Sequence, residues 1–254
     1  NIILQGAPGV GKTFVAQQLA YSMLGTKNDS HIMMVQFHQS YSYEDFIMGY
    51  RPTDSGFELK HGVFYNFCKK AAADRQHEYF FIIDEINRGN LSKIFGELFM
   101  LIENDKRDVE LPLLYSDEMF AVPGNVYLIG TMNTADRSLA MLDYALRRRF
   151  SFYEMNPSFT QDRFQTYQKK LNNKKFDHLI KCVKELNEEI MSDDSLGEGF
   201  YIGHSYFCNL GKNDVDNILA EIVSFELIPL LKEYWFDEPE KVNKWMMRLM
   251  DVIK

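Results

Sequence analysis

The first chemical signal in the chain is a glycine-rich octapeptide that ends in lysine and threonine. It fits the pattern G-x-x-x-x-G-K-[ST] at every fixed position, between an apolar run at 2–4 and a helix-like run at 14–24. Its glycines let backbone N–H groups form a cradle for phosphate oxygens at the positive end of the following helix. The lysine adds a positive charge for the β- and γ-phosphates, and the threonine hydroxyl suits Mg²⁺. This segment, which we call the phosphate loop, therefore predicts triphosphate binding by Gly6, Ala7, Pro8, Gly9, Val10, Gly11, Lys12 and Thr13.

Two acidic residues follow the most apolar strand-like run. Residues 79–83 are typical of a buried parallel strand, and Asp84 and Glu85 come directly after them. Active sites of open α/β sheets lie at the carboxyl ends of such strands. We therefore expect Asp84 to hold Mg²⁺ together with Thr13, and Glu85 to polarise an attacking water. The alternative is a strand that merely ends at two solvated acids, which the phosphate loop about 70 residues upstream disfavours.

Two further polar residues are candidates for the same site. Asn133 follows a short apolar run at 126–131, so we expect its amide to point toward the γ-phosphate or the attacking water. His204 lies in a glycine-punctuated aromatic segment at 196–207. Two roles remain open for it, a contact with the nucleotide or a hydrogen-bonded structural histidine.

Three consecutive arginines, Arg147, Arg148 and Arg149, end a predicted helix at 139–149. Adjacent residues on a helix are about 100° apart, so the three guanidinium groups cannot share one target. At most one or two of them can serve a given nucleotide. Each could instead complement the helix dipole on a solvated face.

Alternating strand and helix patterns predict an α/β unit at residues 1–156. In the first helix, the apolar spacing predicts the face that packs on the sheet. Beyond residue 160 the strand signals nearly vanish, so a mainly α-helical unit is expected at 157–254. The expected strands are 2–4, 32–37, 79–83, 126–131 and 150–153, and the strand at 32–37 is expected to be buried. Hairpins are expected near 52–56 and 109–122. The expected helices are 14–24 with Phe14, Val15, Leu19 and Leu24 inward, 62–75, 91–102, 139–149, 179–191, 215–231 and 242–253.

Composition narrows the class of protein. A hydrophobic content of 46% with 25% charged residues predicts a packed globular core, and the net charge of −8 argues against bulk attraction to nucleic acid. The three cysteines are far apart, which indicates neither a disulfide framework nor a zinc site and favours a reducing cytoplasm. Since no apolar run approaches the ~20 residues of a membrane helix, no membrane association is expected. The chain begins inside its first strand, so we expect it to be an internal fragment.

Several segments together resemble the McrB family, the motor subunit of the modification-dependent restriction system McrBC. The stretch at 132–136, Met-Asn-Thr-Ala-Asp, is the most discriminating of them, because the phosphate loop and the Asp-Glu pair occur in many nucleotide hydrolases. The resemblance implies an AAA+ P-loop NTPase fold, in which a parallel five-stranded sheet flanked by helices is followed by a small α-helical lid. The matching segments are residues 6–13, 38–46, 84–93, 132–138, 145–150 and 202–207.

The resemblance also implies an activity and partners. McrB-like proteins hydrolyse GTP with Mg²⁺, assemble as homo-hexameric rings and recruit an McrC-like endonuclease that stimulates hydrolysis. They find methylated DNA through a separate N-terminal domain and translocate along it, with the ring pore as a further DNA contact. By position, Asn133 resembles the family's sensor asparagine and Asp136 belongs to the same signature. One arginine resembles the finger given to a neighbouring subunit, with Arg148 favoured over Arg149.

Two other readings compete with a GTP-driven motor. One is an ATP-driven remodelling chaperone of the MoxR kind, which shares the Asp-Glu-Ile-Asn-Arg segment at 84–88. The other is a nucleotide-dependent scaffold that assembles without turnover, and Glu85 argues against it because a pure switch needs no positioned base. The residues themselves do not decide between GTP and ATP, since the phosphate loop contacts only phosphates.

Overall fold

The computed structural model describes residues 1–136, 144–211 and 214–254, and the chain forms two compact units. The sheet unit comprises residues 1–5 and 12–154, and the helical unit comprises residues 6–11 and 155–254. The glycine-rich part of the phosphate loop thus groups with the helical unit, although it is far from it in sequence. The chain passes finally into the helical unit between Glu154 and Met155, beside the boundary expected after residue 156.

Five strands form the main sheet of the sheet unit, which confirms the predicted α/β architecture. Strand β1 (Ile2–Gly6) pairs in parallel with β9 (Ser151–Glu154), and β5 (Tyr79–Asp84) pairs in parallel with both β2 (Ile32–Gln36) and β8 (Val126–Asn133). Chain connections from β1 and β8 run in opposite directions across the sheet, so their carboxyl ends flank a point where ligands commonly bind. The order across the sheet is β2 (Ile32–Gln36), β5 (Tyr79–Asp84), β8 (Val126–Asn133), β1 (Ile2–Gly6) and β9 (Ser151–Glu154).

Strand β5 is buried on both faces. Phe81 packs against Phe64 and Phe67 of α3 (Val63–Ala73), with ring centroids 5.0 and 5.2 Å apart. On the opposite face Phe80 stacks on Tyr127 of β8 at 5.4 Å, and α1 (Lys12–Leu24) contacts both strands. Burying each such ring contributes roughly 1.5–3 kcal/mol. This packing holds the strand end that carries Asp84.

Two predictions about apolar faces were wrong. The buried face of α1 carries Ala16 and Ala20, whereas Phe14 is 64% exposed. Alanines have small side chains that let a helix lie close to a sheet, so Phe14 turns to solvent and Val15, Leu19 and Leu24 are only half-buried. Strand β2 was expected to be buried, but Met33 and Met34 are each 39% exposed because β2 is an edge strand.

The helix predicted at 91–102 is two short helices. Gly96 separates them with a φ of 53°, and a Cβ there would lie 2.9 Å from the Tyr43 ring, so glycine is required by both backbone and space. Both expected hairpins are present. The remaining elements of the sheet unit are α2 (Tyr43–Phe46), β3 (Met48–Thr53), β4 (Gly56–His61), α4 (Leu91–Phe95), α5 (Leu98–Leu101), β6 (Leu111–Pro112), β7 (Met119–Phe120) and α6 (Tyr144–Arg147), with 3-10 turns η1 (Asp29–His31), η2 (Ile86–Arg88) and η3 (Asn104–Lys106).

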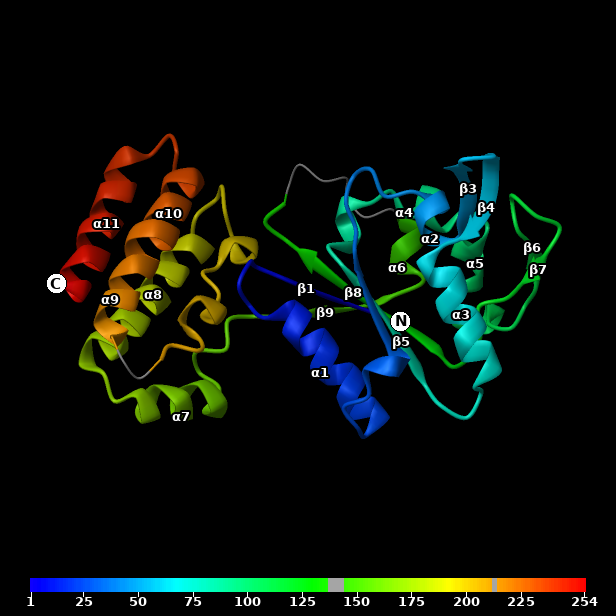
Figure 1. Ribbon diagram of the computed structural model, residues 1–254. Helices are drawn as coiled ribbons and strands as arrows, with labels where there is room; N and C mark the ends of the chain where they lie inside the picture. Colours follow the sequence, from blue (N-terminus) through cyan, green and yellow to red (C-terminus); the bar gives the residue numbers. More distant parts are fainter. Residues whose placement is uncertain (137–143, 212–213) are drawn as a thin grey trace. The chain divides into compact units, whose positions relative to one another are not determined.

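The helical unit is a bundle of helices (Figure 1). Its buried core includes both tryptophans, Trp235 and Trp245. The helical run expected at 215–231 is interrupted by a π-helical stretch, η6 (Ile222–Leu227). Among the helices that the structure describes, none is both long and apolar enough to span a membrane. The elements are α7 (Asp162–Leu171), α8 (Lys174–Met191), η4 (Glu198–Phe200), η5 (His204–Phe207), α9 (Val215–Glu221), η6, α10 (Ile228–Tyr234) and α11 (Pro239–Ile253).

Asp193 connects three parts of the helical unit. Its carboxylate accepts hydrogen bonds from Trp235 Nε1 at 2.8 Å and from Lys241 Nζ at 2.6 Å, and its side chain is 6% exposed. Burial raises the pKa of Asp193, but the bonds from Lys241, Ser195 and Trp235 outweigh it and hold the pKa well below its usual range. The carboxylate therefore stabilises the fold above the pKa of an unfolded aspartate, about 3.9, and this stability is lost as the pH falls toward the depressed folded value.

We expect Asp193→Asn to destabilise the helical unit by about 2–3 kcal/mol at pH 7, because the partly buried Lys241 ammonium then keeps only the more exposed Glu238 as counter-charge. Both tryptophans of the chain lie in this unit, so their fluorescence during urea unfolding reports on it directly. The control is Asp251→Asn, whose ion pair with Lys254 is exposed and should cost under about 1 kcal/mol. Equal urea midpoints for the two variants would contradict a stabilising role of the Asp193 carboxylate.

Candidate active site

The carboxylate of Asp84 is the centre of the polar groups at the carboxyl edge of the sheet. The β5–β8 register pairs Ile83 with Gly130, so Asp84 and Thr131 come next on neighbouring strands. The hydroxyl of Thr13, in the first turn of α1, donates to Asp84 Oδ1 at 2.9 Å, and the buried Thr131 hydroxyl donates to the same oxygen. The structure thus brings the two predicted metal ligands, Thr13 and Asp84, into direct contact.

Glu85 has a left-handed backbone conformation, with φ of 54°. For a residue other than glycine this costs about 1–3 kcal/mol and is most common at functional sites. Its backbone N–H donates to Thr131 Oγ1 at 3.3 Å, while Asn133 Nδ2 donates to its carboxylate at Oε1. Asn133, the last residue of β8, therefore lies beside the predicted base, where its amide fixes one carboxylate oxygen.

Arg88 is a site residue that sequence reasoning missed. Its Nε lies 3.2 Å from Glu85 Oε2, and its Nη2 lies 2.9 Å from Asp136 Oδ2. Arg88 thus forms ion pairs with both Glu85 and Asp136 and connects them. No local sequence signal indicated this contact, because it depends on the 3-10 turn η2, which returns the third residue after Glu85 toward it.

Lys12 lies within the field of these carboxylates and is 8% exposed. Burial lowers its pKa to about 8, against the opposing charges of Glu85, Asp84 and Asp136, which raise it. Lys12 and Arg88 together do not balance the three carboxylates, so the group keeps a net negative charge that suits a divalent cation. The Thr13 hydroxyl and the Asp84 carboxylate are the hard oxygen ligands that Mg²⁺ prefers, so the residues fit that ion.

The glycine-rich part of the phosphate loop, in the helical unit, is shaped by close contacts. Gly9 and Gly11 have φ of 76° and 79°. At Gly6 a Cβ would come within 2.3 Å of the Met155 carbonyl oxygen. A side chain at any of these positions would strain or displace the loop, so the glycines are there for geometric reasons.

The segment 203–206 packs directly on this loop within the same unit. Ser205 N–H donates to the Gly9 carbonyl at 2.9 Å, and a Cβ on Gly203 would lie only 2.0 Å from Gly9 C. His204 Nδ1 accepts from Ser158 N–H at 3.1 Å, and burial lowers the pKa of His204. A neutral imidazole that accepts at Nδ1 carries its proton on Nε2, the nitrogen nearest Gly11. The two roles predicted for His204 are therefore compatible.

The arginines differ in their surroundings. Arg149 Nε donates to the Phe99 carbonyl at 2.8 Å, and its Nη2 pairs with Glu103 at 2.6 Å, so this guanidinium is engaged within its own sheet unit. Arg147 lies over the Phe152 ring at 5.9 Å, and Arg148 is exposed. Of the two arginines predicted to act in catalysis, Arg148 alone is exposed at the surface of this unit. Residues 137–143, with the end of the signature at 132–138, lie outside the described residues.

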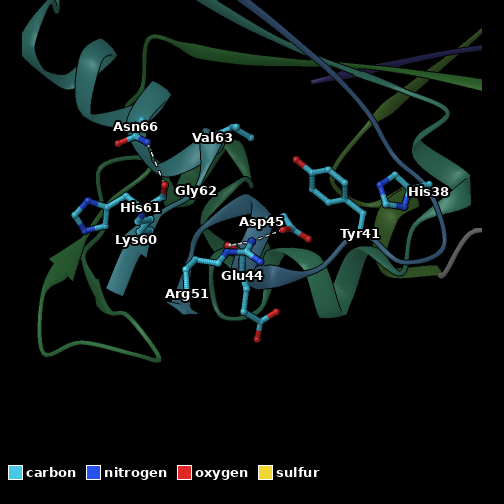
Figure 2. Close-up of a pocket in the computed structure, with 10 residues that line it drawn as sticks. All are labelled: His38, Tyr41, Glu44, Asp45, Arg51, Lys60, His61, Gly62, Val63 and Asn66. Carbon is cyan, nitrogen blue, oxygen red and sulfur yellow. Dashed lines mark hydrogen bonds and ion pairs between the residues drawn. The ribbon is translucent and has the colours of Figure 1, made fainter. Parts of the chain in front are cut away.

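A separate hollow of about 570 Å³ lies among α2, the β3–β4 hairpin and the start of α3 (Figure 2). Three of its charged side chains are engaged with neighbours, since Arg51 pairs with Asp45 and Glu44 accepts from Tyr115 Oη at 2.8 Å. None of the residues predicted to bind nucleotide or metal lines it. The hollow is therefore not the predicted triphosphate site.

We expect Gly203→Ala to weaken triphosphate binding roughly tenfold or more, because the added Cβ must displace the phosphate-loop backbone. Titration with a fluorescent triphosphate measures this. Gly197→Ala is the matched control, since it strains a positive φ in the same unit but meets open space. Wild-type affinity in Gly203→Ala would show that the contact between the two segments is unimportant for binding.

Comparison with known proteins shows which families and relatives this chain resembles. Residues 1–150 match the family model of the AAA domain, dynein-related subfamily, and residues 178–243 match that of the McrB alpha-helical lid domain. The type IV methyl-directed restriction enzyme EcoKMcrB subunit of Escherichia coli (strain K12) is 54% identical over 261 residues, which cover 98% of this chain and 57% of that protein. The type II restriction enzyme BsuMI component YdiS of Bacillus subtilis (strain 168) is 29% identical over 192 residues, 60% of this chain and 56% of that protein.

The chain thus spans somewhat more than half the length of these relatives. One family model matches the α/β part of the chain, and the other matches a segment within the helical part. The match to the AAA domain and the similarity to an McrB subunit support a P-loop nucleoside-triphosphate hydrolase domain. The chain belongs to the AAA family, as a McrB-type AAA domain followed by a McrB-type lid domain.

Proposed function

We propose that this chain is the GTP-hydrolysing motor module of a methylation-dependent restriction endonuclease. The observation that carries the proposal is the cluster in the sheet unit, where Thr13 contacts Asp84 and Asn133 holds Glu85. A metal-binding pair beside a positioned carboxylate is the arrangement that phosphoanhydride hydrolysis requires. The restriction context is supported by 54% identity to an McrB subunit.

The residues divide the chemistry among themselves. Thr13 and Asp84 would hold Mg²⁺, which neutralises phosphate charge when it is bound. Lys12 would bind the β- and γ-phosphates as a cation, and loop N–H groups would bind the phosphate oxygens. Glu85 would accept a proton from the attacking water.

Asn133 and Arg88 restrict where the Glu85 carboxylate can lie. Each holds one of its two oxygens, so the orientation of the base depends on both partners. Because Arg88 also contacts Asp136, a movement of the segment around Asp136 would change the orientation of Glu85. This network therefore links the proposed base to the residues of the McrB-like signature.

The choice of GTP rests on the family and not on residues that contact a base. Guanine presents an O6 acceptor where adenine has an N6 donor, and it adds an N2 amine. A site built for one base leaves buried groups unpaired with the other, at about 1–3 kcal/mol each. The ATP-driven chaperone reading is not favoured, because the lid matches the McrB model.

Assembly is part of the proposal. We infer a homo-hexameric ring that recruits an McrC-like endonuclease, with DNA bound through a separate N-terminal domain and contacted at the ring pore. Both relatives are named as parts of restriction enzymes, which is consistent with a partner nuclease subunit. Arg148 is the proposed finger for a neighbouring subunit, since Arg149 is engaged with Glu103 in its own chain.

The direct test of nucleotide choice is competition between GTP and ATP for the protein with Mg²⁺ present. We expect GTP to bind at least about tenfold more tightly, as one unpaired buried group requires. We also expect slow GTP hydrolysis that accelerates when an McrC-like partner is added. Equal or tighter ATP binding would refute the GTP assignment and favour a remodelling ATPase.

A mixing experiment tests the finger. Arg148→Ala subunits cannot activate a neighbour, and Lys12→Ala subunits cannot bind triphosphate, so mixed rings should regain part of the activity that each variant lacks. Such fingers contribute roughly 10³–10⁵ in rate in related phosphoryl-transfer enzymes. An Arg163→Ala variant, which changes an exposed arginine of α7, is the control and should behave as wild type. If both inactive variants assemble but mixing restores nothing, the finger lies elsewhere.

A further inference from the structure

Three potential metal ligands meet at the amino-terminal edge of the sheet. His31 ends η1 directly before β2, Asp74 follows α3, and His77 lies two residues before β5. Asp84 and Asn133 lie at the carboxyl ends of the parallel strands, which is the opposite edge. The His31–Asp74–His77 cluster is therefore distinct from the candidate active site.

Its ligand atoms already lie close together. His77 Nδ1 is 2.8 Å from Asp74 Oδ1, and His31 Nε2 is 3.8 Å from Asp74 Oδ2. All three ligand atoms lie within 4.8 Å of one another. In a tetrahedral zinc site with bonds of about 2.0 Å, ligand atoms are about 3.3 Å apart. Small side-chain rotations would therefore bring these three into coordination.

The neighbouring residues hold the ligands in place. Asn125 Nδ2 donates to the carbonyl oxygens of Asp74, at 3.0 Å, and His77, at 2.8 Å, which fixes the loop between α3 and β5. The Tyr79 hydroxyl donates to Asp74 Oδ2 at 3.1 Å, and the His31 ring lies against the Tyr79 ring at 4.6 Å. Such supporting contacts are typical of metal sites, because they orient the ligands and hold them ready.

We propose that His31, Asp74 and His77 bind a zinc-type divalent cation. Two imidazoles and one carboxylate form a nitrogen and oxygen ligand set that suits Zn²⁺, whereas Mg²⁺ prefers oxygen ligands alone. The His77 side chain is 58% exposed and that of Asp74 34%, so solvent can supply the fourth ligand. The bound ion joins the start of β2 to the connection between α3 and β5. Because it binds the folded state, it stabilises this edge of the sheet unit.

The test is calorimetric titration of the protein with ZnCl₂, with Mg²⁺ in excess to saturate oxygen-only sites. We expect one tight Zn²⁺ site per chain and a higher thermal unfolding midpoint with Zn²⁺. His31→Phe keeps a ring against Tyr79, Asp74→Asn keeps an acceptor for the Tyr79 hydroxyl, and His77→Ala changes an exposed side chain. Each should weaken Zn²⁺ binding at least about tenfold.

His178→Ala, an exposed histidine on α8 in the other unit, is the control and should leave Zn²⁺ binding unchanged. Circular dichroism of the metal-free variants checks that each is folded. Co²⁺ in place of Zn²⁺ provides a second readout, since its visible absorption reports imidazole coordination. Absence of a stoichiometric Zn²⁺ site in the wild type would overturn the proposal, as would wild-type Zn²⁺ affinity in any folded ligand variant.

Discussion

One carboxylate oxygen, Asp84 Oδ1, organises the candidate active site. It accepts a hydroxyl from Thr13 at the start of α1 and another from Thr131 in β8, so three separate elements meet at one atom. Hydrogen bonds to a charged acceptor contribute about 1.5–3 kcal/mol each, more than neutral ones. Because both donors are hydroxyls, they can rotate when a cation approaches. The same contacts that position the helix can therefore yield to a metal ion.

The second constraint is the backbone at Glu85. Strand β5 delivers Asp84 in an extended conformation, and the left-handed turn at Glu85 then reverses the chain into η2. Without that turn Arg88 would not return to the Glu85 carboxylate. The strain is offset by the bond between Glu85 N–H and Thr131, by Asn133 and by Arg88. Local strain, a buried hydroxyl and an ion pair thus act together to fix the position of one carboxylate.

Much of this could be predicted from the sequence because the signals were local. The acids after a buried apolar run predicted a role for Asp84 and Glu85, and the octapeptide predicted one for Lys12 and Thr13; the structure brings Thr13 into contact with Asp84. Thr131 could not be found in this way, because its role depends on the β5–β8 register, and neither could Arg88, whose contact depends on a positive φ at Glu85.

The failures have similar physical origins. Helical periodicity placed Phe14 inward, but close helix–sheet packing selected the alanines of α1. Apolar composition made β2 look buried, but its edge position exposes its methionines. The pattern at 91–102 showed one helix, yet Gly96 breaks it where space beside Tyr43 is short. In each case the burial or the helix boundary depended on tertiary contacts, which the local sequence pattern does not contain.

In the proposed function, Glu85 is the base of a hydrolytic site that Lys12 and Thr13 supply with triphosphate. The most direct test of this role is Glu85→Gln, which removes the charge but keeps the shape, measured for triphosphate affinity and for steady-state hydrolysis. We expect unchanged or tighter triphosphate binding and a hydrolysis rate lower by about 10²–10⁴, the usual contribution of a general base. Glu110→Gln, at an exposed position, should match wild type. A Glu85→Gln protein that hydrolyses within a few-fold of the wild-type rate would contradict the account.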